Sequence, residues 1–346
     1  MTTTAYKAAT DFLVYSHTFG LSTMEGRGFY YPSDTAFGKD GVIYTVSRSL
    51  EGEAAARGVR VTVYDVDSEF SHTFGTFGDG PGHMLWPTAI LVDRQGRVYI
   101  SDEQLNRITI FDASGGFLSM WGERGSAEGQ LDGPSGMAFD ADENLYVVDH
   151  LNNRVQKFTA DGRFLLAFGT EGAGDGQFNL PWGMTVDSHG DVYVADWRND
   201  RVQKLSAEGK FIASYGSTGE GDGEFRRPSG VAVDGDSYIY VSDWGNERVQ
   251  VLGPDGAFIA KYRGEATNSI WAEEYMESNV EERDARARSN MEPDIDYFED
   301  TAHEESSHIE KLFWAPTAVT LDSEGRLFVT ESNRQRVQVY ERRRGA

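Results

Sequence analysis

Short apolar runs, separated by polar or glycine-rich turns, recur along most of the chain. Residues 183–187 and 192–196 form two such runs around the turn sequence Ser-His-Gly. Residues 201–205 alternate between polar and apolar side chains, and a fourth run occupies residues 211–216. Runs of this length are typical of β-strands, and the alternation indicates a strand with one buried face. The pattern therefore predicts a small antiparallel sheet of four strands.

The same pattern returns at a fixed interval. Four copies open at prolines that lie 47 residues apart, and in each copy an Asp follows the Pro by 15 positions and an Arg follows the Asp by five. These copies open at Pro87, Pro134, Pro181 and Pro228. A fifth copy opens at Pro316, with Glu331 in the Asp position, and a degenerate sixth opens at Pro32. Repetition of one four-stranded unit is typical of a β-propeller, so we expect six blades.

The two ends of the chain are expected to share the last blade. The copy that opens at Pro316 ends at Tyr340 after only three strands. Residues 12–20 match the outer strand at residues 164–169 in pattern, so the N-terminal segment is predicted to supply the missing strand. Such closure removes exposed sheet edges. The predicted fold class is all-β: a single six-bladed β-propeller over residues 1–346, whose N-terminal strand closes blade six.

The repeat text resembles the NHL repeat. The pattern P-x-G-[VM]-x-x-D…Y-V-x-D-x-x-N-x-R-V-Q is present in the fourth blade as Pro181, Gly183, Asp187, Tyr193, Val194, Asp196, Asn199, Arg201, Val202 and Gln203. The resemblance extends over nearly the whole chain and implies a six-bladed propeller. NHL propellers include enzymes, RNA-binding proteins and protein-interaction modules, so the resemblance selects no single function.

One group with a similar propeller, the peptidyl-hydroxyglycine amidating lyases, binds zinc through His residues that include one directly after the repeat Pro. In this chain the residues after the repeat Pro are Ser33, Thr88, Ser135, Trp182, Ser229 and Thr317. None of them is His, which argues against that activity.

Two insertions interrupt the repeats, at residues 49–58 and at residues 265–312. The first lies between the second and third strands of blade one, and the other lies between the outer strand of blade five and the inner strand of blade six. In a propeller both kinds of connection lie on the same face, which we call the upper face. Elaboration of one face indicates that function resides there.

The insertion at residues 265–312 is expected to be partly helical. Trp271 and Tyr275 form an apolar pair at helical spacing, and Glu282 and Arg286 form an ion pair at that spacing. Thr301 opens a capping-box pattern for a second short helix. The segment holds fifteen Asp and Glu against four Lys and Arg. We interpret it as an acidic lid over an upper-face pocket; the alternatives are a disordered acidic loop and a docking surface for a partner.

Several side chains are expected to ring the upper mouth of the channel. The residue after the repeat Asp varies between blades, as Arg48, Glu103, His150, Trp197, Trp244 and Ser332. Six tryptophans fall on upper-face segments: Trp86, Trp182, Trp197, Trp244, Trp271 and Trp314. Large aromatic side chains around a concave mouth suit a ligand with a planar or apolar face. These tryptophans and Arg48 are therefore the predicted ligand-binding residues, although ordinary surface variation would explain the same pattern.

The candidates for acid, base or metal-ligand roles are Glu103, His150 and Glu331. A single divalent ion held by His150 and His83 together with Glu103 or Glu331 is a weaker hypothesis, because no recognised metal motif supports it. The repeated Asp and Arg are interpreted as structural, since residues present in every blade are expected to tie strands together.

The charge and hydropathy of the chain argue against some classes of binding partner. The formal net charge is −24, with 32 basic and 56 acidic residues, which argues against nucleic acid because phosphate binding depends on Lys and Arg. No apolar run is long enough to span a membrane, and the first residues lack the apolar core of a secretory signal. We therefore expect no membrane partner and a cytoplasmic location.

The sequence is consistent with two classes of function. The first is a small-molecule site on the upper face beneath the acidic insertion, with a lyase or hydrolase as the reaction class by fold analogy only. The alternative is a protein-interaction scaffold whose acidic insertion docks a basic partner.

Overall fold

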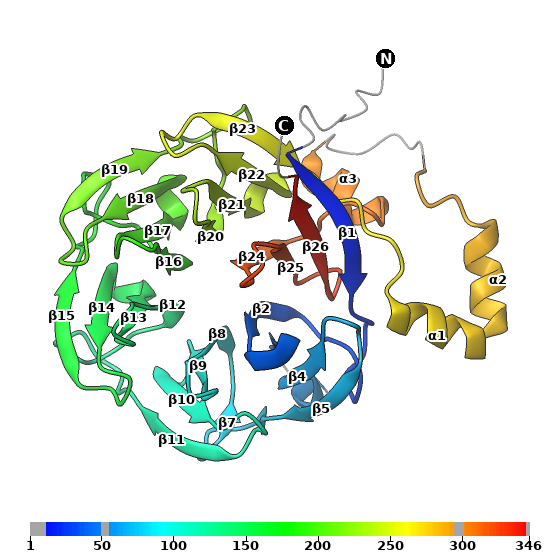
Figure 1. Cartoon of the computed structure of the whole chain (residues 1–346), viewed down its shortest axis with the longest axis horizontal. Helices are drawn as coiled ribbons and strands as arrows, with labels where there is room; N and C mark the ends of the chain where they lie inside the picture. Colours follow the sequence, from blue (N-terminus) through cyan, green and yellow to red (C-terminus); the bar gives the residue numbers. More distant parts are fainter. Residues whose placement is uncertain (1–11, 50–54, 294–300, 344–346) are drawn as a thin grey trace.

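The computed structural model describes residues 12–49, 55–293 and 301–343. Six four-stranded antiparallel sheets stand around a central axis, as the sequence predicted (Figure 1). Blade one contains β2 (Pro32–Phe37), β3 (Val42–Ser47), β4 (Arg60–Asp65) and β5 (Phe70–Phe74). Blade two contains β8 (Pro87–Val92), β9 (Val98–Asp102), β10 (Arg107–Phe111) and β11 (Phe117–Trp121). Blade three contains β12 (Pro134–Phe139), β13 (Leu145–Asp149), β14 (Arg154–Phe158) and β15 (Phe164–Phe168).

The second half of the ring continues in the same order. Blade four contains β16 (Met184–Val186), β17 (Val192–Asp196), β18 (Arg201–Leu205) and β19 (Phe211–Tyr215). Blade five contains β20 (Pro228–Val233), β21 (Ile239–Asp243), β22 (Arg248–Leu252) and β23 (Phe258–Tyr262). Blade six contains β24 (Pro316–Leu321), β25 (Leu327–Glu331), β26 (Arg336–Arg342) and β1 (Leu13–Phe19). A short parallel pair, β6 (Thr76–Phe77) and β7 (His83–Met84), lies in the connection between blades one and two.

The N-terminal strand closes the ring, as predicted. β1 pairs antiparallel with β26, with Leu13 opposite Arg342 at one end and Phe19 opposite Val337 at the other (Figure 1). The main-chain N–H of Leu13 also donates to the Tyr262 hydroxyl of blade five, at 2.7 Å. Blade six is therefore built from both ends of the chain.

Apolar residues of the second and third strands fill the space between neighbouring blades. Tyr99, Tyr146, Tyr193 and Tyr240 occupy the same position in successive blades, and each is almost completely buried. Every hydrophobic cluster of the core draws on residues of two adjacent blades or of the segments beside them. The apolar core therefore lies between neighbouring blades and not at the axis of the ring. As a result, the inner strands line a central cavity.

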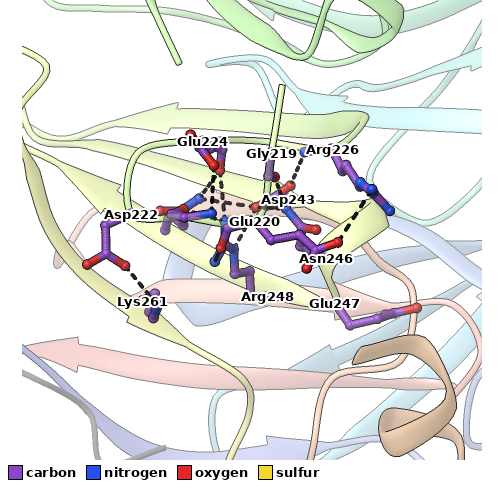
Figure 2. A network of polar contacts seen from close by, with 12 residues as sticks. Gly219, Glu220, Asp222, Glu224, Arg226, Asp243, Asn246, Glu247, Arg248 and Lys261 are labelled. Atoms are coloured by element: carbon purple, nitrogen blue, oxygen red, sulfur yellow. Dashed lines mark hydrogen bonds and ion pairs between the residues drawn. The ribbon is translucent and has the colours of Figure 1, made fainter. Parts of the chain in front are cut away.

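The repeated Asp and Arg hold the upper ends of the strands together, as interpreted from the sequence. In blade five, Asp243 accepts hydrogen bonds from the Arg226 main chain (2.7 Å), Asn246 (2.8 Å) and Arg248 (2.7 Å) (Figure 2). Arg248 also donates to the main-chain carbonyl of Glu224. Asp149 and Asp196 make the equivalent bonds in blades three and four. These residues hold the upper-face connections in place. The residue directly after the repeat Asp can differ from blade to blade.

The insertion at residues 265–312 contains α1 (Ile270–Ser278), α2 (Val280–Arg288) and α3 (Ala302–His308). The Thr301 side chain caps α3 through the Glu304 N–H, as the capping-box pattern predicted. Two short helices, α1 and α2, replace the single helix expected before Pro293, and Arg286 pairs with Glu310 instead of Glu282. In the part of the chain that the structure describes, no helix is long and apolar enough to cross a membrane.

The position of the insertion differs from the predicted lid. α1 and α2 lie outside the ring beside β1, and do not extend over the central cavity (Figure 1). The indole of Trp271 holds α1 there, because it packs against Phe29 and Tyr64 at the side of the ring. Of the three described helices, only α3 approaches the upper mouth, where it contacts the connection at the start of β22. Packing of a large aromatic side chain on the flank therefore carries most of the insertion away from the channel.

Candidate functional site

A cavity of about 370 Å³ runs through the centre of the ring. Residues of all six inner strands line it, and their side chains are apolar or hydroxyl-bearing with one exception. Among the residues that the structure describes, Asp34, on β2, is the only ionisable one in this lining. A lone carboxyl in a weakly polar cavity is a candidate for binding or proton transfer.

Asp34 joins three blades at the cavity wall. One carboxylate oxygen accepts from the Thr35 N–H at 2.8 Å, and the other accepts from the Ile90 N–H of blade two at 3.1 Å. The Thr320 hydroxyl of blade six donates to the first oxygen at 3.5 Å. Each oxygen has two acceptor sites, so these contacts leave capacity for a ligand.

The pKa of Asp34 is raised from its usual value to about 7. Burial causes the rise, because it disfavours the charged form, and the hydrogen bonds from Ile90, Thr35 and Thr320 only partly offset it. The carboxyl borders the cavity, so its side chain is half-buried although the ring surrounds it. A carboxyl with this pKa can both give and take a proton near neutral pH.

Sequence reasoning missed Asp34, although the repeat carries a signal for it. The residue two positions after the repeat Pro is small in every other blade: Ala89, Gly136, Gly183, Gly230 and Ala318. At Gly183 an added Cβ would lie 2.4 Å from the Ser229 carbonyl, which explains why the inner strands favour small residues there. An Asp at this position is therefore a departure from the repeat of the kind that marks function.

Asp34 makes stability depend on pH. Its pKa is 3.8 when unfolded and about 7 when folded, so its contribution is fully present below pH 3.8 and is lost as pH rises through 7. This difference in pKa corresponds to at most about 4 kcal/mol of folding stability, less where water enters the cavity. Asp34→Asn should remove this dependence of stability on pH, as measured by urea unfolding of both proteins at pH 5 and pH 8.

Asp142→Asn, on an exposed turn, is the matched control. Equal slopes in wild type and Asp34→Asn would refute the assignment.

Four aromatic side chains gather on the upper face of blades three to five. The ring of His150 meets that of Trp182 edge to face at 4.9 Å, and Trp197 lies 6.5 Å from Trp244. Trp182 also lines the central cavity and donates its main-chain N–H to the carbonyl of Ala195, just before Trp197. We call His150, Trp182, Trp197 and Trp244 the tryptophan rim. The three tryptophans are half-buried, so part of each indole faces solvent.

His150 is the least accessible member of the rim, at 6% exposure. Its Nδ1 lies 3.0 Å from the Pro181 carbonyl, which can only accept, so Nδ1 carries the proton and Nε2 the lone pair. Burial lowers the pKa of His150, and the hydrogen bond to Pro181 opposes that effect. A neutral imidazole with this tautomer is a base, but its burial limits the approach of a substrate.

A second group of predicted residues lies on blades one and two. The Arg48 guanidinium stacks over Trp86, at 5.0 Å from the ring centre. Burial raises the pKa of Glu103, and the positive charge of Arg48 partly opposes the rise. Burial also lowers the pKa of Arg48, and Glu103 opposes that change. Arg48 and Glu103 therefore form a partly desolvated charge pair beside an indole.

A third group lies on blade six, where Trp314 is stacked by Arg334 at 5.2 Å. The ring of His303, on α3, lies 6.1 Å from Trp314. His303 in turn contacts Glu247, whose other oxygen accepts from the Ala315 N–H at 2.6 Å. α3 therefore borders the upper face next to Trp314 and the Trp244–Asn246 connection.

Three predicted site residues lie elsewhere or are fully engaged. Trp271 is 1% exposed in the apolar core, so it presents no surface to a ligand. Glu331 is completely buried and bound by Arg336, Gln338 and the Trp314 main chain, which is the structural role of the repeat Asp. His83 is exposed on β7, in the connection between blades one and two. Within residues 12–49, 55–293 and 301–343, no three His, Asp or Glu side chains gather as metal ligands, so the hypothesis of a site at His150 and His83 gains no support.

Comparison with protein families agrees with the repeat. The model described as "SMP-30/Gluconolactonase/LRE-like region" matches residues 54–220, and the NHL repeat model matches residues 225–252 and 313–340. This chain is an NHL-repeat six-bladed β-propeller. A search of curated proteins finds no match to this propeller.

Solved structures share the fold of this NHL propeller. A streptogramin B lyase is 12% identical with a TM-score of 0.55, over 96% of this chain and 98% of that one. A catalytically inactive virginiamycin B lyase from Staphylococcus aureus, with quinupristin, is 12% identical with a TM-score of 0.56, over 95% and 88%. A Bacteroides thetaiotaomicron protein of unknown function is 18% identical with a TM-score of 0.60, over 95% and 75%. At these identities the likeness shows the fold alone.

Proposed function

We propose that this propeller binds a small molecule at the upper mouth of its central cavity and acts on it by proton transfer, as a lyase or hydrolase. The observation that carries the proposal is the placement of one ionisable residue, Asp34, in a cavity that Trp182 lines at its upper end. Aromatic surface at the mouth suits a planar or apolar ligand. A carboxyl inside the cavity suits acid–base chemistry on the part that enters.

The reaction class rests on chemistry and on analogy. Asp34 and Glu103 both have raised pKa values, so each holds a proton more readily than an exposed carboxyl. Eliminations and hydrolyses both require a group that removes one proton and supplies another. Two structures that share the fold are named as lyases, which favours elimination by fold-level analogy. Of the described residues of the insertion, those of α3 border this site, next to Trp314 of blade six and the Trp244–Asn246 connection of blade five.

The proposal is tested by binding at the rim. A thermal-shift screen of aromatic small molecules, including quinupristin, should find compounds that stabilise the wild type. Trp197→Ala and Trp244→Ala should each lose ~1 kcal/mol or more of binding energy, because a stacking surface is removed. Both variants should keep the wild-type melting temperature without ligand, since neither indole is fully buried.

A matched control for these variants is Trp121→Ala, whose indole lies on the outer strand β11. That change should leave ligand binding intact, and any loss of stability in it reports on packing alone. Retention of full binding by both rim variants would place the ligand elsewhere. Asp34→Asn should then abolish turnover of any hit that reacts while leaving its affinity within about threefold, because the loss concerns the reacting proton.

A scaffold that docks a basic partner through the insertion is the second candidate. It is favoured by three apolar side chains on α1 and α2 that are 41–54% exposed, Ile270, Tyr275 and Val280. Exposed acids lie beside them on both helices, including Glu277 and Glu281. A labelled Lys-rich peptide should bind the wild type with strong salt dependence, and Glu277→Lys with Glu281→Lys should abolish that binding. Binding that ignores both salt and these changes would exclude this candidate.

A further inference from the structure

Two arginines on the tryptophan rim stack on the same indole. The guanidinium carbon of Arg198 lies 5.6 Å from the centre of the Trp197 ring, and that of Arg227 lies 5.0 Å from it. They come from different segments: Arg198 follows β17 in blade four, and Arg227 directly precedes β20 in blade five. Both side chains are exposed. Two separate connections therefore bring positive charge to one aromatic surface.

Neither guanidinium has an acidic or hydrogen-bonding partner among the residues that the structure describes. The neighbouring Arg226, by contrast, pairs with Glu220 at 3.4 Å. The carboxylates two residues from Arg198 are Asp196, which binds Arg201, and Asp200, which accepts from the Arg227 main-chain N–H (2.7 Å) and the Thr218 hydroxyl (2.7 Å). In a chain of net charge −24, two neighbouring arginines that form no ion pair with a described residue require an explanation.

Helices α1 and α2 do not form ion pairs with these arginines. α1 and α2 stand across the ring, next to blade six and blade one, whereas the arginines belong to blades four and five (Figure 1). At physiological ionic strength, charges separated by more than about 8 Å of solvent interact weakly. Helices α1 and α2 therefore do not neutralise Arg198 and Arg227.

The chemistry of a stacked guanidinium indicates what it binds. When its flat face lies against an indole, the N–H groups at its edge remain available, and they match the two oxygens of a carboxylate or phosphate. The adjoining indoles of Trp197 and Trp244, inclined to each other by 48°, offer two apolar faces at the same place. A ligand with a planar ring and a negative group would contact both.

We propose that the ligand of the tryptophan rim is a planar anion, whose carboxylate or phosphate binds Arg198 and Arg227 while its ring contacts the indoles of Trp197 and Trp244. This inference rests on the proposed function, for which it names the class of ligand. It also sets an orientation: the charged end lies above blades four and five, and the remainder of the ligand extends toward Trp182 and the cavity.

The test compares two probes that differ in charge and share a ring: indole-3-acetate and the neutral indole-3-acetamide. Calorimetry should show that wild type binds the acetate at least about tenfold more tightly, since a charge-assisted contact contributes more than a neutral one. Arg198→Gln combined with Arg227→Gln should remove that difference and leave acetamide binding within about twofold. Arg226→Gln, which removes an adjacent arginine already paired with Glu220, is the matched control and should change neither affinity.

The outcomes separate this inference from the proposed function. Equal affinity of wild type for the two probes, or a preference for the acetate that survives the double arginine change, would overturn the planar anion but leave a rim that binds neutral ligands. Loss of binding of both probes in Trp197→Ala, with a preference for the acetate in wild type, supports both statements. Absence of any indole-3-acetate binding at millimolar concentration would overturn the inference, whereas the thermal-shift screen tests the proposed function independently.

Discussion

Deletion of residues 1–20 should destabilise the whole propeller by at least about 5 kcal/mol, which is comparable to the total stability of an ordinary domain. The deletion removes β1, whose Leu13 and Phe19 are 5% and 1% exposed in the core of the ring. Burial of each such side chain contributes about 2–3 kcal/mol, and the ladder of hydrogen bonds to β26 is lost with them. The exposed edge of β26 should also promote association between chains.

The matched control is deletion of residues 1–11, which leaves β1 intact. That protein should melt at the wild-type temperature in calorimetry, whereas deletion of residues 1–20 should lower the melting temperature sharply or prevent folding. Because a chain that fails to fold gives no transition, Phe19→Ala supplies a graded version and should cost about 3–5 kcal/mol in denaturant unfolding. A wild-type melting temperature after removal of residues 1–20 would contradict closure of blade six by β1.

The fold was predictable because the same sequence pattern recurs from blade to blade. Constant offsets between Pro, Asp and Arg in several copies indicate one structural unit, and the missing strand after Tyr340 indicates closure by residues 12–20. The same logic explains why the repeat Asp is structural, since Asp243 and its equivalents bind the same partners in each blade. Its extension to Glu331 was missed, although this residue occupies the same position.

The site was less predictable because it depends on residues that occur once. The upper-face position of Trp182, Trp197 and Trp244 follows from the repeat, but their contacts with Arg198 and Arg227 do not, since side-chain directions on separate connections are not encoded in the repeat. Asp34 was not identified from the sequence for a different reason. Blade one is the degenerate copy, so a departure within it carries less weight until the inner strands are seen to converge on one cavity.

The insertion was the hardest segment to place, because no second copy exists to compare it with. Its helices were predicted from spacing and capping, and the structure contains them with an additional break at Asn279. The position of these helices depends on contacts between residues that are far apart in the sequence. Trp271 packs on residues of blade one, and its Nε1 donates to the Ser68 carbonyl at 2.6 Å. An apolar residue at helical spacing indicates that a face is buried, but not which surface covers it.

Trp271→Ala should therefore cost about 3–5 kcal/mol of stability, the usual range for removing a large buried aromatic side chain. The change empties the space between Phe29 and Tyr64 and leaves the Ser68 carbonyl without its donor. Tyr275→Ala, on the same helix but 41% exposed, is the control and should stay within about 0.5 kcal/mol of wild type. Denaturant unfolding measures both, and limited proteolysis should show earlier cleavage within residues 265–293 in the Trp271 variant alone. If α1 detaches before the ring unfolds, the proteolysis difference should be present below the unfolding transition. Unchanged stability of Trp271→Ala, together with loss of ligand binding at the rim, would instead assign Trp271 to the ligand site.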